Sequence, residues 1–141
     1  HRMELVGEVG GVSWFNASKA TNAASAAPAL AAFPPAPDQR LHWIAGGKAK
    51  GDGLAACRPW FGHVQRAYLI GEAMEPFADE IGDAIPVERS GDLAAAVKQA
   101  AAMAKPGDIV LLSPACASFD QFKDYEQRGD VFRAAVQALG A

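Results

Sequence analysis

Three polar segments, each directly after a short apolar run, carry the side chains that are best suited to holding a small charged ligand. They are residues 16–22 (NASKATN), 46–53 (GGKAKGDG) and 113–118 (SPACAS). Lysines, hydroxyls and amides donate hydrogen bonds to carboxylates and phosphates, and glycines let backbone N–H groups come close to a ligand. The chemistry that these segments favour is therefore recognition of an anion.

Each segment also has an ordinary structural explanation. The first could be a capped helix start with a solvated Lys19, because Asn22 is a good N-cap residue. The second could be a flexible glycine turn. In the third, Ser118 and Gln121 form an S-x-x-Q pattern that is typical of a helix capping box. The residues alone leave both explanations of each segment open.

Several catalytic motifs are missing from these segments. Lys48 is followed by Ala49, so the G-K-[ST] of a P-loop is absent, and no G-x-G-x-x-G follows the first strand. Cys116 has no histidine nearby in sequence, so a catalytic thiol is not expected. The three histidines lack the spacing of a metal site, and no metal site is predicted.

The elements that must position these segments alternate between strands and helices. Gly10 and Gly11 separate two β-prone runs and predict a hairpin. Asn22 and Asp92 are candidate helix caps, and Pro28 predicts a late start or a kink in the first helix. The expected strands are 4–9, 12–15, 41–45, 67–70, a short one near 85–87, and 109–112. The expected helices are 22–33, 54–61, 73–81, 93–104 and a last region from 118 to 139. This last region is expected to be interrupted or bent near Gly129, with 131, 132, 135, 136 and 139 on its inner face.

This order predicts an α/β fold, a Rossmann-like three-layer domain whose mainly parallel sheet carries an antiparallel N-terminal hairpin. We expect one domain over residues 1–141, because no linker or repeat interrupts the pattern. Ligands bind such sheets at the carboxyl ends of the strands. The three polar segments lie at those ends.

The bulk composition limits the partners. A net charge of −3 offers no basic field for a nucleic acid, so none is expected. No apolar run approaches the roughly 20 residues that span a bilayer, so no membrane association is expected either. Two cysteines are too few for a disulfide framework; as free thiols they indicate a reducing compartment, and we predict a cytoplasmic protein.

Taken together, the motifs resemble one family. The chain is similar, from His1 to Gly140, to the C-terminal domain of the Mur ligases, and within them to the branch that adds D-glutamate. The residues that carry this resemblance are the opening His1-Arg2 and the stretches 12–16 (VSWFN), 18–22 (SKATN), 111–118 (LLSPACAS), 120–123 (DQFK) and 126–129 (EQRG).

The resemblance implies a parent enzyme of peptidoglycan precursor synthesis. That ligase uses ATP to phosphorylate the carboxylate of UDP-N-acetylmuramoyl-L-alanine, and the amine of D-glutamate attacks the acyl phosphate. ATP, magnesium and the uridine nucleotide would be held mainly by the UDP-binding and central ATPase domains, which are absent from this chain. The chain alone is therefore expected to be inactive, to bind no cofactor tightly and to be a monomer.

The resemblance also assigns roles to individual residues. The D-glutamate carboxylates would be held by Thr21, Lys50, Ser118 and the backbone of Tyr125, and the nucleotide would be faced by Arg2 and Lys19; no residue of this chain would be catalytic. The sequence departs from the family pattern at Ala17, where an aspartate suited to a ribose hydroxyl is usual, and at Lys48-Ala49 in the turn before Lys50.

Two other functions remain open from the residues alone. One is a self-standing Rossmann-like nucleotide-binding module, which is favoured only if the native chain begins near His1. The other is an interaction domain without a small-molecule ligand. Sequence upstream of His1 would distinguish the first from the ligase domain, because the ligase requires a preceding P-loop domain.

Overall fold

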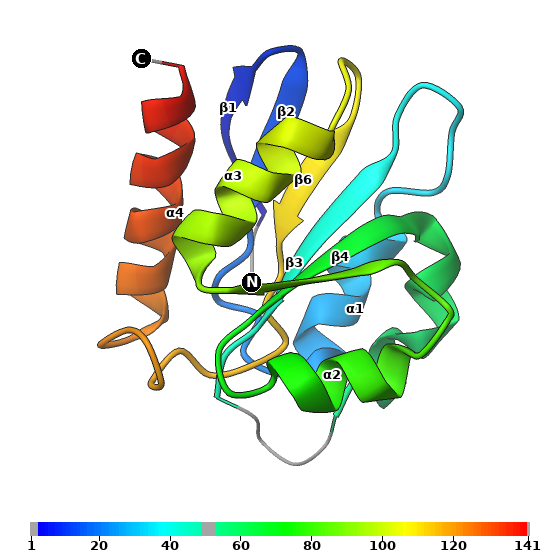
Figure 1. The fold of residues 1–141 in the computed structure, drawn as a ribbon, viewed down its shortest axis with the longest axis vertical. Helices are drawn as coiled ribbons and strands as arrows, with labels where there is room; N and C mark the ends of the chain where they lie inside the picture. Colours follow the sequence, from blue (N-terminus) through cyan, green and yellow to red (C-terminus); the bar gives the residue numbers. More distant parts are fainter. Residues whose placement is uncertain (1–2, 49–52, 141) are drawn as a thin grey trace.

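A computed structural model describes residues 3–48 and 53–140 and contains one six-stranded sheet in the order β1-β2-β6-β3-β4-β5 (Figure 1). β1 and β2 are antiparallel, and every other neighbouring pair is parallel. The predicted α/β class and its N-terminal hairpin are thus confirmed. The strands are β1 (Glu4–Val9), β2 (Val12–Asn16), β3 (Leu41–Gly46), β4 (Val64–Ile70), β5 (Val87–Gly91) and β6 (Ile109–Leu112).

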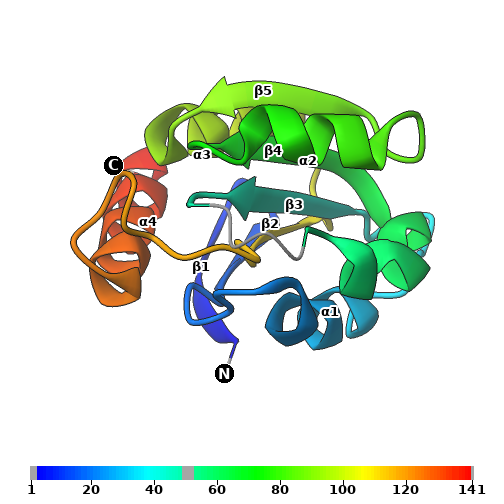
Figure 2. The same cartoon turned by 90° about the horizontal axis from the view of Figure 1, so that it is seen from below.

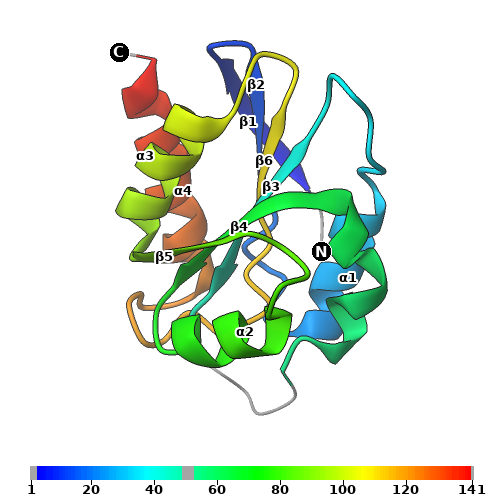
Figure 3. The same cartoon turned by 45° about the vertical axis from the view of Figure 1, so that its right-hand side comes forward.

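Helical elements cover both faces of the sheet, which gives the predicted three layers (Figure 3). One hydrophobic cluster joins the sheet to α1 (Ala23–Ala31), the 3-10 helix η1 (Ala55–His63) and α2 (Met74–Ile81). The other joins it to α3 (Leu93–Met103) and α4 (Tyr125–Leu139). None of the helices that the structure describes has the length and apolar character needed to cross a membrane.

The central strands are buried on both faces. All six residues of β3 are buried, and the neighbours Trp43 and Ile44 belong to opposite clusters. Aromatic side chains anchor each layer, because Trp43 packs against Phe61 of η1 and Trp14 against Phe132 of α4. This explains why the sequence of β6, IVLL, shows no alternation of apolar and polar residues.

The local signals at the hairpin and at two helix starts act as predicted. Gly10 and Gly11 both have positive φ, 63° and 81°, as a two-residue hairpin loop requires. The side chains of Asn22 and Asp92 accept hydrogen bonds from Ser25 N and Ala95 N, each at 2.8 Å. α1 begins directly after Asn22 with Pro28 inside it, so a late helix start was the wrong prediction.

The helix predicted at 54–61 is present, and the predicted start of the last helix was wrong. The element after Leu54 is a 3-10 helix, and it contains Pro59, which has no N–H to donate to an α-helical bond. Ser118 caps no helix: Gln121 N and Phe122 N donate to its backbone oxygen, and α4 begins at Tyr125 behind the cap Asp124.

α4 runs from Tyr125 to Leu139 through Gly129, so the interruption that was one of the two predicted alternatives there is absent. A Cβ at Gly129 would lie 2.9 Å from Asn16 Nδ2, so the glycine allows the helix to lie close to the end of β2. Of its predicted inner face, Phe132 and Val136 are buried, whereas Val131 is 37% exposed.

Gly46 shows how closely neighbouring strands meet at their carboxyl ends. Its φ is +124°, and a Cβ would lie 2.1 Å from the backbone oxygen of Ile70. We predict that Gly46→Ala lowers the free energy of unfolding by about 2–4 kcal/mol, because it combines backbone strain with a clash against main chain. Gly62→Ala, where nothing lies within 4 Å, is the matched control. Urea unfolding measures both, and equal effects would contradict the close approach.

A buried hydrogen-bonded chain, Tyr68–His42–Asp108, joins β4 to β3 and to the start of β6. Tyr68 Oη and His42 Nδ1 are 2.9 Å apart, and His42 Nε2 is 3.0 Å from Asp108 Oδ2. Burial lowers the pKa of His42 in spite of the nearby Asp108 carboxylate. A neutral imidazole with its proton on Nε2 satisfies this chain, because it donates to Asp108 and accepts from Tyr68.

This chain predicts a loss of stability in mild acid. His42 binds a proton less readily in the folded state than in the unfolded state, so its contribution is complete above pH about 6.5 and declines below that value. We expect the free energy of unfolding to fall between pH about 7 and 5. His42→Gln should flatten this dependence, whereas the control His63→Gln should preserve it. Denaturant unfolding at each pH measures the slope, and an unchanged slope in His42→Gln would refute the assignment.

Candidate functional site

The predicted polar segments meet at the carboxyl ends of the parallel strands. Backbone hydrogen bonds join segment 113–118 to the other two: Ala115 N donates to Ala20 O at 3.0 Å, and Lys48 N donates to Ala117 O at 2.9 Å. From this end of the molecule, the chain after β6 is seen to cross the sheet edge toward α4 (Figure 2). The structure therefore brings together three segments that are far apart in the sequence.

A buried arginine ties these segments to α4. Arg128 lies in the first turns of α4 and is 0% exposed. Its Nε donates to Ser18 Oγ at 2.9 Å, its Nη2 to Ser18 O at 2.6 Å and its Nη1 to Cys116 O at 2.9 Å. Ser18 Oγ in turn donates to Tyr125 O at 2.7 Å. One guanidinium thus links the loop after β2, the loop after β6 and the start of α4.

The charge of Arg128 survives its burial. Burial lowers the pKa of the guanidinium to about 10, partly opposed by Cys116 and Asp120. The group is therefore still a cation at neutral pH, and its three hydrogen bonds compensate for part of the lost hydration. Its positive charge also makes this edge of a net acidic protein more favourable for an anion.

Asn16, at the end of β2, shapes the same edge. Its Oδ1 accepts from Ser18 N at 2.9 Å, and its Nδ2 donates to Glu4 at 3.1 Å. Glu4 also pairs with Arg133 of α4 at 2.9 Å. These contacts hold the loop that carries Lys19 between the hairpin and α4.

The predicted binding residues lie around this edge with different exposures. Thr21 is partly buried just before the cap of α1, Lys19 is exposed and Tyr125 is 36% exposed at the first residue of α4. Ser118 is only 2% exposed, so a ligand reaches its hydroxyl only if neighbouring groups move. Lys50 and Arg2 lie outside the described residues.

Two hollows share Lys19. One, of about 370 Å³, has charged side chains of both signs and is lined by Glu4, Asn16, Ser18, Lys19, Tyr125, Glu126, Gly129, Asp130 and Arg133. The other, of about 500 Å³, is mainly apolar and is lined by Met3, Ala17, Lys19, Ala20, Ser25, Pro28 and Ala29. Lys19 and Tyr125 are thus brought together by the first hollow, and Lys19 and Ala17 by the second.

Two features bear on the expected chemistry. Within residues 3–48 and 53–140, no cluster of three or more His, Cys, Asp or Glu side chains is placed to hold a metal ion. Neither Cys57 nor Cys116 forms a disulfide, and both are buried. Burial raises the pKa of Cys57 to about 12, so this thiol is a poor nucleophile at neutral pH.

Sequence reasoning missed the role of Arg128. The available signal was its position: residues 128, 132 and 136 follow one another at the spacing of a helix face, and Phe132 and Val136 are buried. A charged residue on an apolar helix face needs buried acceptors. The sequence does not show which acceptors Arg128 has, because one of them, Ser18, is 110 residues away.

Comparison with known proteins supplies the family. Residues 1–116 match the family model described as "Mur ligase, glutamate ligase domain". The chain belongs to the Mur ligase family. Two relatives named UDP-N-acetylmuramoylalanine–D-glutamate ligase are similar to it: one from Sphingopyxis alaskensis, 85% identical over the whole chain, and one from Novosphingobium aromaticivorans, 57% identical over 99% of it. The chain spans about a third of their length, 32% and 30%.

A solved structure supports the fold of this Mur ligase domain. It is a domain from a Haemophilus ducreyi protein described as a putative UDP-N-acetylmuramate:L-alanyl-gamma-D-glutamyl-medo-diaminopimelate ligase. The match has a TM-score of 0.54 and covers 96% of this chain and 99% of that one. At 13% identity the similarity concerns the fold alone.

We predict that removing the guanidinium of Arg128 destabilises this Mur ligase domain. Arg128→Met leaves the buried Ser18 and Cys116 carbonyls without their donors and should cost about 2–4 kcal/mol of unfolding free energy. The control is Arg133→Met, whose ion pair with Glu4 is partly exposed and is expected to contribute at most about 1 kcal/mol. Urea unfolding compares them, and a loss at Arg128 no larger than at Arg133 would count against the linking role.

Proposed function

We propose that this chain is the D-glutamate-binding, C-terminal domain of an ATP-dependent amide ligase of peptidoglycan precursor synthesis. The parent enzyme joins D-glutamate to UDP-N-acetylmuramoyl-L-alanine in the cytoplasm. The observation that supports the proposal is the edge formed by the described parts of the three polar segments around Arg128, because hydrogen bonds there join the stretches of chain that carry Thr21, Ser118 and Tyr125. The names of the two relatives support the choice of substrate.

The glutamate side of the proposed site consists of Thr21, Lys50, Ser118 and the backbone of Tyr125. D-Glutamate has two carboxylates, and this protein has a net charge of −3, so a local cation and aligned donors are needed. Tyr125 is the first residue of α4, where free backbone N–H groups and the helix dipole favour a carboxylate. Access to the buried Ser118 hydroxyl would require the 118–124 segment to move when the ligand binds.

The nucleotide side consists of Lys19 and Arg2. The apolar hollow of about 500 Å³ beside Lys19 is compatible with the edge of a nucleotide bound between this domain and the rest of the enzyme. Ala17 lines the same hollow, and its methyl group cannot accept a hydrogen bond from a ribose hydroxyl. ATP binding would then rely on Lys19, Arg2 and the other domains.

The chemistry divides between this domain and the missing ones. A carboxylate is a poor acyl donor until its oxygen becomes a leaving group, which ATP achieves by phosphorylating it. Cations must offset the charge that accumulates at that centre. By the resemblance to the Mur ligases, we assign magnesium to the parent's other domains. The part of this domain is to bind and orient the amine-bearing substrate.

Lys50 provides the direct test of the glutamate site. In the full-length ligase, Lys50→Ala should remove a charge-assisted contact of about 1.5–3 kcal/mol, and therefore raise the KM for D-glutamate about tenfold to a hundredfold. The KM for ATP should change much less. Steady-state kinetics in which D-glutamate and ATP are varied separately measure both constants.

The matched control is Lys48→Ala in the same turn. Lys48 pairs with Glu72 at 3.6 Å, and both side chains are more than half exposed, so its loss should leave the glutamate KM nearly unchanged. If Lys50→Ala behaves like Lys48→Ala, the glutamate site is misplaced.

The isolated chain should neither hydrolyse ATP nor form an amide bond. No P-loop sequence is present, and the described residues offer no site for phosphate and magnesium together. A phosphate-release assay of the 141-residue chain with ATP, magnesium and D-glutamate is expected to match the blank. Magnesium-dependent release above the blank would overturn this division of labour.

A further inference from the structure

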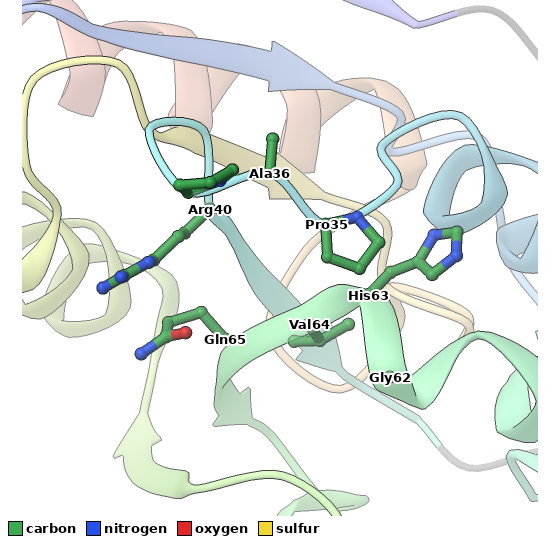
Figure 4. A pocket seen from close by; sticks show the side chains of 8 residues that line it. Pro35, Ala36, Arg40, Gly62, His63, Val64 and Gln65 are labelled. Carbon is green, nitrogen blue, oxygen red and sulfur yellow. The ribbon is translucent and has the colours of Figure 1, made fainter.

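Two neighbouring hollows lie at the amino ends of β3, β4 and β6, the opposite end of the sheet from the proposed glutamate site. The larger, of about 240 Å³, is lined by Pro35, Ala36, Pro37, Arg40, Gly62, His63, Val64 and Gln65 (Figure 4). The smaller, of about 120 Å³, shares Arg40 and Gln65 with it. Since β3 has six residues, this edge is about 20 Å from the carboxyl ends of the strands.

The smaller hollow is cationic. Its lining includes Arg40, Arg66 and Lys105, and the only carboxylate among its lining residues is Asp108. That carboxylate faces inward: it is 5% exposed and accepts hydrogen bonds from Arg40 N, Lys105 N and His42. Asp108 thus anchors the two backbone segments that carry Arg40 and Lys105, and its carboxylate is hydrogen-bonded within the protein.

Two of the three cations are available to a ligand. Arg66 is held by Glu88 at 2.7 Å. Arg40 and Lys105 are exposed and form no ion pair with any residue in the described ranges 3–48 and 53–140. The protein has a net charge of −3, so two cations without an ion-pair partner beside a hollow make the local electrostatic potential more positive there.

The larger hollow supplies the apolar half of the site. Proline rings, Ala36 and the side chain of Val64 form its wall, and no carboxylate is among its lining residues. Arg40 and Gln65 lie toward one end of this hollow and His63 toward the other, with Pro35 and Val64 between them (Figure 4). A ligand that spans both hollows would therefore meet guanidinium and amide donors at one end and an apolar surface at the other.

We propose that these paired hollows bind a small phosphomonoester with a compact apolar body, at a site separate from the glutamate edge. A phosphomonoester carries a charge of about −1.5 to −2 at pH 7 and three acceptor oxygens, which suits a guanidinium and an ammonium group together. The apolar body enters the hollow lined by prolines. The two volumes limit the ligand to a small molecule.

The test uses NMR titration of the 141-residue chain with phenyl phosphate, inorganic phosphate and benzoate. Phenyl phosphate is expected to bind most tightly and to shift the amides of Arg40, Gln65 and Lys105. Inorganic phosphate lacks the apolar body and benzoate lacks the second charge, so each should bind more weakly. Benzoate equal to phenyl phosphate would overturn the phosphate specificity, and inorganic phosphate equal to it would overturn the role of the apolar hollow.

Two variants that each remove one positive charge distinguish binding at this site from non-specific electrostatic attraction of the ligand to the protein. Arg40→Gln should weaken phenyl phosphate about threefold to tenfold, because it removes one partly exposed charge-assisted contact. Lys98→Gln removes the same charge from the exposed face of α3 and should leave the affinity unchanged. Equal losses in both variants, or shifts centred on Lys19 and Tyr125, would refute the site. Arg40 is exposed, and its anchoring N–H remains in Arg40→Gln, so the fold is retained and the comparison is decisive.

Discussion

The guanidinium of Arg128 is the contact on which the carboxyl-terminal edge of the sheet depends. Two loops direct buried backbone carbonyls toward it, Ser18 O after β2 and Cys116 O after β6. A planar guanidinium with five N–H donors in a rigid fork reaches acceptors on both segments at once. Burying the guanidinium costs free energy because the charge loses its hydration. The same positive charge favours an anion at the nearby protein surface. Structure and proposed ligand binding therefore rest on one side chain.

The rest of the fold is arranged so that this side chain can reach its acceptors. Gly129 lets α4 approach Asn16, and Gly47 lets the turn after β3 approach Ala117 and Arg128 itself. The two glycines lie on different elements and serve the same approach. At the opposite end of the sheet, the buried Asp108 carboxylate links neighbouring segments in the same way with a negative charge. It accepts hydrogen bonds from the N–H groups of Arg40 and Lys105 and from the His42 imidazole.

Much of the architecture was predictable from local chemistry. Several predictions that depend only on residues close in sequence were confirmed. They are the Gly10-Gly11 loop, the caps at Asn22 and Asp92, and the buried strand β6. The start of α4 was not predicted correctly. The sequence pattern at Ser118 and Gln121 predicted the start six residues too early; the chain after β6 first crosses the end of the sheet, and the helix begins behind Asp124.

The fold class, the family and the three polar segments could be read from the residues alone, because periodicity, caps and motifs act over short distances and survive as patterns of residue type. Which polar groups are buried together follows from the packing of distant segments. Arg128 and Ser18 are 110 positions apart, and the residue type of neither one indicates the other. The free energy of such a contact depends on the exclusion of water, which exists only once the helix has packed against the sheet.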